Sequence, residues 1–364
     1  MLPRVTFALS GCTACLLIAL TVVGSNSQHV GDVSTIGLAD HPVIDVFFLQ
    51  SQGVWILESD RRHEFLFRSF DEGRNWSDIP LQFPLHELFF LDSQHGWATE
   101  TRDDHDSVLA TSDGGLNWNV ICPRLPSETL MVVGMFFTDL AHGWVLATQP
   151  KGLSIVLQTS DGGRTFSVAK ALSGKFGLSH VLVSAPDSAN LWMLGEDSVL
   201  YSPDGGQGWV SQVKSANLPG RRKSISFFGG HAFADGRVLL VGQSAGAVIL
   251  KSTNLGSDWH LVTESNAAHW FNDIQFWDDN HGCAVGGSTL LFCTADRGDT
   301  WEARNVLPRS QTATPSVENT FEKLFLAKGG TRGWVLAGDG FLFETEDGGN
   351  SWRRLDLIET SNGR

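Results

Sequence analysis

Three acidic residues stand at equivalent places in three distant segments of the chain. Asp45 precedes Val-Phe-Phe, Glu87 precedes Leu-Phe-Phe and Asp273 precedes Ile-Gln-Phe, so each acid comes directly before the apolar part of an expected strand. Carboxylates that converge can bind a cation, and two of them at a suitable separation can cleave a glycosidic bond. Carboxylates at the mouth of a channel can equally be solvated charges without a ligand. Each interpretation needs an architecture that brings the three segments together.

Other residues that could do chemistry follow no catalytic or metal-binding pattern. His41, His86 and His180 lie close to the same expected strands, but their spacing matches no metal motif. Residues 103–106, Asp-Asp-His-Asp, are expected in an exposed loop, with weak cation binding as the alternative. The sequence has no nucleophile elbow, phosphate loop, dinucleotide fingerprint or zinc motif. We therefore predict no catalytic residue, no metal and no cofactor.

The elements that would position these residues follow from a motif that occurs seven times. An Asp or Asn is followed by Gly two positions later and by Trp or Phe five positions later. The acid or amide accepts hydrogen bonds from later backbone N–H groups, Gly tolerates positive φ, and the aromatic ring covers the turn. Such repetition predicts structural turns, called Asp-boxes, rather than one active site. The seven positions are Asp71, Asp113, Asp161, Asp204, Asn254, Asp296 and Asp347.

The spacing of the Asp-boxes predicts the fold. Successive boxes are 42 to 51 residues apart, which fits one four-stranded propeller blade. A second motif, Phe-x-Asp followed by His-Gly-Trp, precedes several boxes and marks strand–turn–strand. In the second repeat we expect strands at 88–91, 97–99, 108–111 and 118–121. The sequence therefore predicts an all-β, seven-bladed β-propeller of antiparallel blades over residues 41–357.

The two motifs resemble those of the bacterial Asp-box (BNR-like) propellers of the photosystem II assembly/stability factor family. The likeness covers about residues 41–357. It implies a seven-bladed propeller on the luminal or periplasmic side of a membrane that binds a partner protein, such as a membrane-complex subunit, during assembly. Members of the family use a basic surface patch, and the comparable feature here is Arg221-Arg222-Lys223.

The same motif also occurs in enzymes, so an alternative function stays open. Sialidases, xyloglucanases and sortilin-type receptors contain Asp-boxes. A glycoside hydrolase or carbohydrate-binding propeller would use the carboxylates at the channel mouth. A sialidase needs a tyrosine nucleophile, and the single tyrosine, Tyr201, lies three residues before Asp204, at the Asp-box end of its blade. We favour a non-enzymatic scaffold that binds a protein.

The expected partner-binding rim lies where the innermost strands begin. Besides Asp45, Glu87 and Asp273, it includes Arg221, Arg222 and Lys223 in one interblade loop and Trp270 in another. Trp270 stands outside both repeated motifs, which account for nearly all other tryptophans.

Two cysteines form a candidate disulfide in the sixth repeat. Cys283 stands where other repeats have the Trp of His-Gly-Trp, and Cys293 is expected opposite it across a hairpin. They would be bonded in an oxidising compartment if their Cα atoms lie within about 4.4–6.8 Å. Cys122 has no partner and is expected as a buried free thiol.

Composition and the N-terminal sequence predict where the protein acts. The formal net charge of −14 argues against a nucleic-acid partner. Residues 1–27 have the pattern of a cleaved signal peptide, with an uncleaved membrane anchor as the alternative. A linker at 28–40 and a tail at 358–364 flank the propeller. We expect an exported monomer in a periplasmic, luminal or extracellular compartment, in contact with a membrane only through this N-terminal segment.

Overall fold

The structure is a computed structural model, and the residues that it describes lie within Thr35–Arg364. Residues 1–27, 28–40 and 358–364, for which a signal, a linker and a tail were predicted, lie outside the described residues, as does the basic stretch at 221–223. The part of the chain that is described has no helix of the length and hydrophobicity needed to cross a membrane. The described residues are 43–49, 53–59, 64–71, 73, 75–102, 105–126, 131–149, 153–172, 180–182, 190–194, 198–214, 225–306, 320–327, 329–338 and 342–355.

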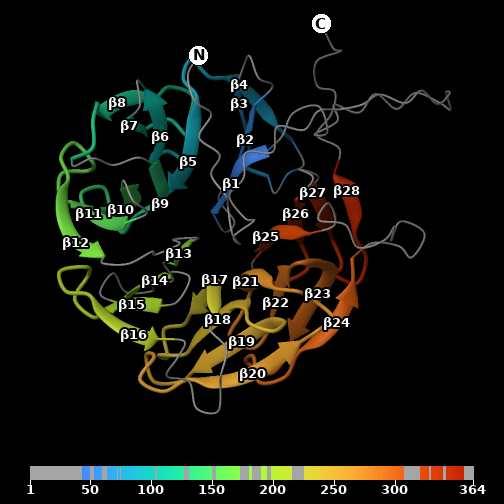
Figure 1. The fold of residues 1–364 in the computed structure, drawn as a ribbon. Helices are drawn as coiled ribbons and strands as arrows, with labels where there is room; N and C mark the ends of the chain where they lie inside the picture. Colours follow the sequence, from blue (N-terminus) through green and yellow to red (C-terminus); the bar gives the residue numbers. More distant parts are fainter. Residues whose placement is uncertain are drawn as a thin grey trace, which may run out of the picture. The chain divides into compact units, whose positions relative to one another are not determined.

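The fold is a seven-bladed β-propeller, as predicted. Each blade is an antiparallel sheet of four strands that follow one another in the chain. The blades form a ring in chain order, with the first strand of each blade innermost and the fourth outermost (Figure 1). The strands, from blade 1 to blade 7, are β1 (Val43–Leu49), β2 (Gly53–Ser59), β3 (Glu64–Ser69) and β4 (Ser77–Pro80); β5 (Leu85–Phe90), β6 (Gly96–Arg102), β7 (His105–Thr111) and β8 (Asn119–Cys122); β9 (Met131–Phe137), β10 (Gly143–Gln149), β11 (Leu153–Thr159) and β12 (Ser167–Leu172); β13 (His180–Leu182), β14 (Leu191–Leu194), β15 (Ser198–Ser202) and β16 (Val210–Lys214); β17 (Ser226–Ala232), β18 (Val238–Gln243), β19 (Ala247–Ser252) and β20 (His260–Ser265); β21 (Phe271–Phe276), β22 (Gly282–Gly286), β23 (Ser288–Thr294) and β24 (Glu302–Asn305); β25 (Phe321–Leu326), β26 (Gly333–Ala337), β27 (Leu342–Thr345) and β28 (Arg353–Leu355).

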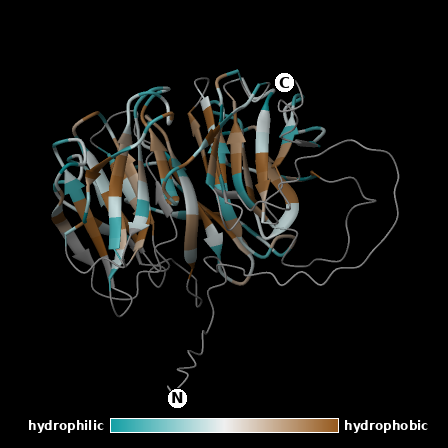
Figure 2. Cartoon of the chain, turned by 90° about the horizontal axis from the view of Figure 1, so that it is seen from above, coloured by the Kyte–Doolittle hydropathy of each residue, from teal (hydrophilic) through white to brown (hydrophobic). Residues whose placement is uncertain are grey.

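The hydrophobic core lies between neighbouring blades. Side chains alternate along a strand, so each sheet presents one apolar face to the preceding blade and one to the following blade. In β2, Trp55 packs against Phe90 of blade 2, while Ile56 packs in the cluster that contains Trp334 of blade 7. Figure 2 shows hydrophobic residues concentrated in the strands and more hydrophilic residues in the turns at their ends. The blades therefore stabilise one another by burying both faces of every sheet.

The predicted strands of blade 2 are present, with bounds that differ at their ends. β5 begins at Leu85, three residues earlier than expected, and β8 begins after Trp118 rather than at it. The interpretation of residues 103–106 as an exposed loop was wrong for its second half, because His105 and Asp106 lie in β7. Asp106 is buried, and its carboxylate accepts hydrogen bonds from the Thr101 hydroxyl and from the N–H of Val132 in blade 3. It caps a strand of the next blade.

The ring closes without exchanging a strand among the described sheets, since blade 1 is β1–β4 and blade 7 is β25–β28. Side chains make the contact instead. The rings of Phe48 and Phe325 stack with centroids 3.6 Å apart, and Phe48 also contacts Trp334. Closure therefore depends on packing and polar contacts between blades 7 and 1.

Candidate functional site

The innermost strands bring one residue from every blade to the same level of the central channel. In blade 2, Trp97 of the second strand pairs with Phe89 of the innermost strand, and Glu87 lies two residues before Phe89. The same rule, applied to the second-strand Trp of each blade or to the residue that replaces it, gives one residue per blade. We call this set the channel column. It is Asp45, Glu87, Gly134, His180, Gly229, Asp273 and Lys323. The structure thus places the three acids singled out from the sequence at one level, and adds a lysine to them.

Asp45 connects three blades through its carboxylate. Oδ1 accepts a hydrogen bond from the N–H of Val46 at 2.8 Å, and Oδ2 accepts one from the N–H of Leu88 in blade 2 at 2.9 Å. Nζ of Lys323 in blade 7 donates to Oδ1 at 2.5 Å. A carboxylate with these three donors from blades 1, 2 and 7 has a structural function.

Asp273 repeats this arrangement between blades 6 and 7. Its carboxylate accepts hydrogen bonds from the N–H of Ile274 at 2.8 Å and from the N–H of Leu324 at 2.9 Å. Burial raises the pKa of Asp273, although these backbone bonds and the nearby Lys323 ammonium oppose the rise. Two of the three predicted acids therefore tie adjacent innermost strands together.

Lys323 is the cation of the channel column, and the sequence analysis missed it. Burial alone would lower the pKa of Lys323, but the charges of Asp45, Glu87 and Asp273 raise it above its ordinary value. The signal was present in the sequence. Phe325 pairs with Trp334 as Phe89 pairs with Trp97, and Lys323 and Glu87 each lie two residues before that Phe.

Glu87 differs from the other two acids. Among the described residues its carboxyl accepts no hydrogen bond, and the N–H of Glu87 is held by the Thr99 hydroxyl at 3.3 Å. Burial, followed by the negative charge of Asp45, raises the pKa of Glu87 to about 7. Glu87 is therefore the acid of the column whose carboxyl accepts no hydrogen bond from the described residues.

The hydrogen bonds of the three acids bear on the two chemistries considered for them. Among the described residues no group of His, Cys, Asp and Glu is placed to hold a metal ion. Hydrolysis of a glycosidic bond needs two carboxyl groups free to exchange protons or attack the sugar. Asp45 and Asp273 are occupied by backbone donors, which leaves Glu87 alone.

Trp270 lies directly before β21, the innermost strand of blade 6. Its indole ring rests against Gly287, where an added Cβ would lie 2.6 Å from the ring, and Gly287 donates its N–H to the Trp270 carbonyl. The side chain stays partly exposed. Beside it, the buried Asn272 donates a side-chain hydrogen bond to Glu322 of blade 7 at 3.0 Å, a contact that the sequence did not indicate.

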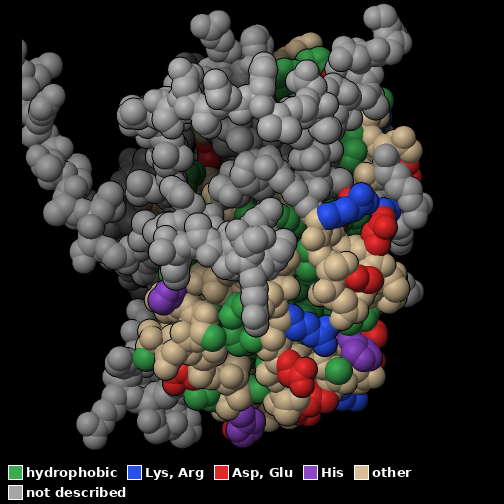
Figure 3. Space-filling model, turned by 90° about the vertical axis from the view of Figure 1, so that its right-hand side faces the viewer, with side chains coloured by type: hydrophobic (Ala, Val, Ile, Leu, Met, Phe, Trp, Pro, Cys, Tyr) green, Lys and Arg blue, Asp and Glu red, His purple; other side chains and the backbone are tan. Residues whose placement is uncertain are grey.

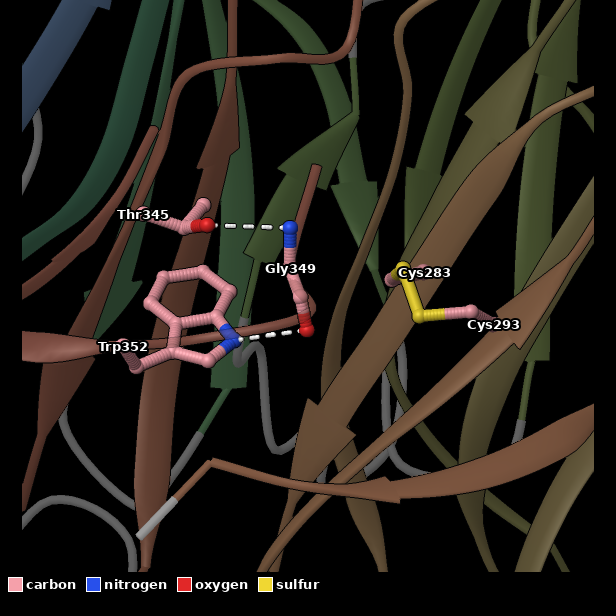
Figure 4. The surroundings of a disulfide bond; sticks show 5 residues. All are labelled: Cys283, Cys293, Thr345, Gly349 and Trp352. Atoms are coloured by element: carbon pink, nitrogen blue, oxygen red, sulfur yellow. Dashed lines mark hydrogen bonds between the residues drawn. A yellow bond between two sulfur atoms is a disulfide. The ribbon is translucent and has the colours of Figure 1, made fainter. Parts of the chain in front are cut away.

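The Asp-box acids hold turns at the opposite end of the blades. In blade 7 the Thr345 hydroxyl accepts a hydrogen bond from the N–H of Gly349 (Figure 4). The same hydroxyl donates to Asp347, and Asp347 accepts from the N–H of Ser351 at 2.8 Å. The hydrogen bond from the Ser351 hydroxyl contributes most to lowering the pKa of Asp347 to about 2. The same contacts to a preceding Ser or Thr and to the N–H four residues later recur at Asp71, Asp113, Asp161, Asp204, Asn254 and Asp296.

Cys283 and Cys293 are joined by a disulfide, and Cys122 is a buried free thiol. The two bonded residues are directly opposite each other in β22 and β23, with Cα atoms 4.0 Å apart, slightly closer than the range set from the sequence.

The surface in Figure 3 shows acidic and basic side chains next to one another on the described part of that side. The described part of this face therefore shows no large patch of a single charge in this view.

A family model described as photosynthesis system II assembly factor YCF48 matches residues 123–269 and 251–364. The photosystem II assembly lipoprotein Ycf48 of Synechococcus sp. (strain CC9902) is 31% identical over 120 residues, which are 33% of this chain and 34% of that protein. The match thus spans about a third of that relative.

Solved structures share the fold at low sequence identity. A structure titled YCF48 bound to D1 peptide has a TM-score of 0.62 and 17% identity, and the alignment covers 84% of this chain and 93% of that one. The GH74 enzyme of Niastella koreensis has a TM-score of 0.54 and 12% identity, covering 88% of this chain and 60% of that one.

Proposed function

The chain belongs to the photosynthesis system II assembly factor YCF48 family, and from this premise we propose that it is a non-enzymatic scaffold that binds a segment of a membrane-complex protein. The observation that carries the proposal is the family match, whose two parts run together from residue 123 to residue 364. The structure titled YCF48 bound to D1 peptide supports a peptide as the bound species.

We place the binding surface at the mouth of the channel, around Trp270 and Glu87. Trp270 offers a partly exposed indole on a rigid support, since Gly287 lies directly behind it. Glu87 offers a carboxyl that accepts no hydrogen bond from the described residues, and Asn272 and Glu322 add a polar group nearby. Aromatic rings and adaptable polar groups on a rigid frame favour peptide binding because little conformational entropy is lost. The basic stretch at 221–223 is proposed as a further contact.

Export is part of the same proposal. The Synechococcus relative is described as a lipoprotein, which supports a protein held at a membrane outside the cytoplasm. A disulfide between Cys283 and Cys293 fits an oxidising compartment. We propose that residues 1–27 direct export, either as a cleaved signal or as an anchor, and that 41–357 form the binding domain.

Glycan binding or hydrolysis is the competing function. The fold shared with a GH74 enzyme motivates it, but at 12% identity this likeness concerns the fold alone. The hydrogen bonds that occupy Asp45 and Asp273 argue against it.

The test is capture of the partner by the full-length protein in its own membranes, with photo-crosslinking followed by mass spectrometry. We expect one membrane protein to be enriched, and Trp270→Ala to reduce its capture by roughly tenfold, as for an aromatic anchor of an interface. Leu116→Ala is the matched control, because Leu116 is an exposed apolar residue at the Asp-box end.

Equal losses for the two variants would place the interface elsewhere. A saturable response to xyloglucan fragments, with no protein enriched, would overturn the scaffold function.

A further inference from the structure

Every blade has a pair of directly opposed residues, one on its second strand and one on its third, that lies against the Asp-box of the following blade. We call it the blade pair. In blades 1 and 2 the second-strand residue is a tryptophan whose indole N–H donates to the next Asp-box: Trp55 to the Gly114 carbonyl at 3.1 Å, and Trp97 to the Gly162 carbonyl at 2.9 Å. The seven pairs are Trp55–Arg68, Trp97–Ala110, Trp144–Gln158, Trp192–Tyr201, Leu239–Lys251, Cys283–Cys293 and Trp334–Glu344.

Blade 5 shows that the pair keeps this contact when the tryptophan is absent. Leu239 has no N–H to donate from its side chain, and Lys251 opposite it donates to the Arg297 carbonyl of the blade 6 Asp-box at 3.0 Å. Arg237 donates to the same carbonyl at 3.3 Å. In blade 5 an ammonium and a guanidinium group therefore replace the indole N–H as donors to the carbonyl of the second residue of the next Asp-box.

In blade 6 the pair is the disulfide. Cys283 and Cys293 are 2% and 5% exposed, and they pack with Leu324 and Val335 of blade 7. Figure 4 shows the disulfide beside Thr345, Gly349 and Trp352, which belong to the Asp-box region of blade 7. The compact sulfur bridge lies where other blades have an indole.

The glycines of the Asp-boxes show which side chains lie closest to each box. An added Cβ on Gly206 would lie 2.3 Å from the indole of Trp144, and one on Gly163 would lie 3.5 Å from that of Trp97. At Gly349 the neighbours within 4 Å are atoms of Trp352, from its own box. At the Asp-box itself blade 7 is therefore met by the disulfide rather than by an indole of the pair, and the covalent bond holds the pair in shape. The indole that blade 6 places against blade 7 is that of Trp277, which would lie 2.2 Å from a Cβ added to Gly330.

We propose that the Cys283–Cys293 bond is a redox-sensitive lock that fixes blade 6 in the shape that docks blade 7. It forms when the two thiols give two electrons and two protons to a disulfide oxidant, which becomes a dithiol. A dithiol reductant reverses the reaction and is itself oxidised to a disulfide. The two unbonded thiols then need more room than the bridge, and β22 and β23 lose their cross-link, so the packing against Leu324 and Trp352 loosens.

The position of blade 7 in the ring gives the lock a wider effect. Blade 7 carries Lys323, which pairs with Asp45 of blade 1, and the N–H of Leu324, which binds Asp273 of blade 6. Loosening blade 7 therefore disturbs the channel column on both sides. This inference concerns the protein alone and does not depend on the proposed partner.

The experiment compares oxidised and reduced full-length protein by thermal unfolding and by hydrogen exchange. We expect a dithiol reductant to lower the unfolding midpoint by about 5 °C. Exchange in β25–β28 should become roughly tenfold faster while β9–β12 stay unchanged. Cys122→Ser is the control for the free thiol, and it should respond to the reductant as the natural protein does.

Two double variants separate the lock from a general effect of cysteine loss. Cys283→Ser/Cys293→Ser should unfold at the midpoint of the reduced protein and ignore the reductant. Cys283→Trp/Cys293→Ala reproduces the Trp97–Ala110 pair of blade 2, and it should unfold at a higher midpoint than the serine variant in either condition. The proposal is overturned if reduction, verified by thiol titration of the folded protein, changes neither the midpoint nor the exchange of β25–β28. It is also overturned if reduction speeds hydrogen exchange equally in all blades.

Discussion

Nζ of Lys323 lies 2.5 Å from Oδ1 of Asp45, and this ion pair joins the last blade of the ring to the first. Oδ2 of the same aspartate accepts the N–H of Leu88, so blades 7, 1 and 2 share one carboxylate. No described sheet contains strands from both ends of the chain, so the ring is closed by side chains: this ion pair and the stacked rings of Phe48 and Phe325.

Lys323→Met should therefore destabilise the ring. The lysine side chain is 34% exposed and the aspartate 10%, so the expected loss lies between those of exposed and buried pairs, at about 1–2 kcal/mol. Urea unfolding measures it. In a double-mutant cycle with Asp45→Asn, the two losses should not add; full additivity would show that the contact has no energetic effect.

Glu58 makes stability depend on pH. This residue of β2 is 3% exposed, its Oε1 has no hydrogen-bond partner among the described residues, and burial raises its pKa from 4.5 to about 7. The folded protein therefore binds more protons than the unfolded chain between pH 4.5 and about 7, and this contribution to stability is lost as the pH rises through that window.

Glu58→Gln should remove this dependence and raise stability at pH 8 by about 2 kcal/mol, with little change at pH 4. Unfolding by urea at several pH values measures the difference. Glu302→Gln on the exposed strand β24 is the control and should leave the profile unchanged. An unchanged pH profile for Glu58→Gln would show that Glu58 is solvated.

The Asp-boxes predict a difference between two substitutions at one site. Asn254 makes in blade 5 the contacts that Asp296 makes in blade 6, to a preceding hydroxyl and to the N–H four residues later. Asp296→Asn should therefore cost little at pH 7, whereas Asp296→Ala should cost about 1–2 kcal/mol because the turn donors lose their acceptor. Thermal unfolding distinguishes them, and equal losses would contradict the turn function.

Acid should weaken the same turn. The hydrogen bond from the Thr300 hydroxyl contributes most to lowering the pKa of Asp296 to about 2, from 3.8. Its stabilisation is present above pH 3.8 and is lost as the pH falls through about 2. In Asp296→Asn this part of the acid sensitivity should be absent.

The tryptophans of the blade pairs allow a matched comparison. Trp97 donates its indole N–H to the Gly162 carbonyl, whereas the indole N–H of Trp144 has no hydrogen-bond partner among the described residues. Trp97→Phe should therefore destabilise the protein by about 1 kcal/mol more than Trp144→Phe, since it leaves a buried carbonyl unpaired. Chemical denaturation measures both, and the reverse order would contradict the importance of this hydrogen bond.

The fold was predictable because local chemistry repeats. An Asp or Asn, a Gly with positive φ and an aromatic residue close each of the seven turns, and Gly73 and Gly349 have the φ values of 77° and 84° that the motif requires. Strand ends were less predictable: β5 starts at Leu85 because a bulge before Leu88 continues the ladder past Glu87.

The channel column was only partly predictable. Aligning apolar runs placed Asp45, Glu87 and Asp273 at one level, but Lys323 was missed because its repeat departs from the motif around it. The sequence also could not show that Asp45 and Asp273 accept N–H groups from a neighbouring blade, since these bonds join residues 43 and 51 positions apart. Such contacts depend on how the blades stand against one another.

Each sheet is drawn from one uninterrupted stretch of sequence, and the described ring has no sheet shared between its two ends. Duplicating or deleting one such stretch in the gene would thus add or remove one complete blade and would leave no incomplete sheet.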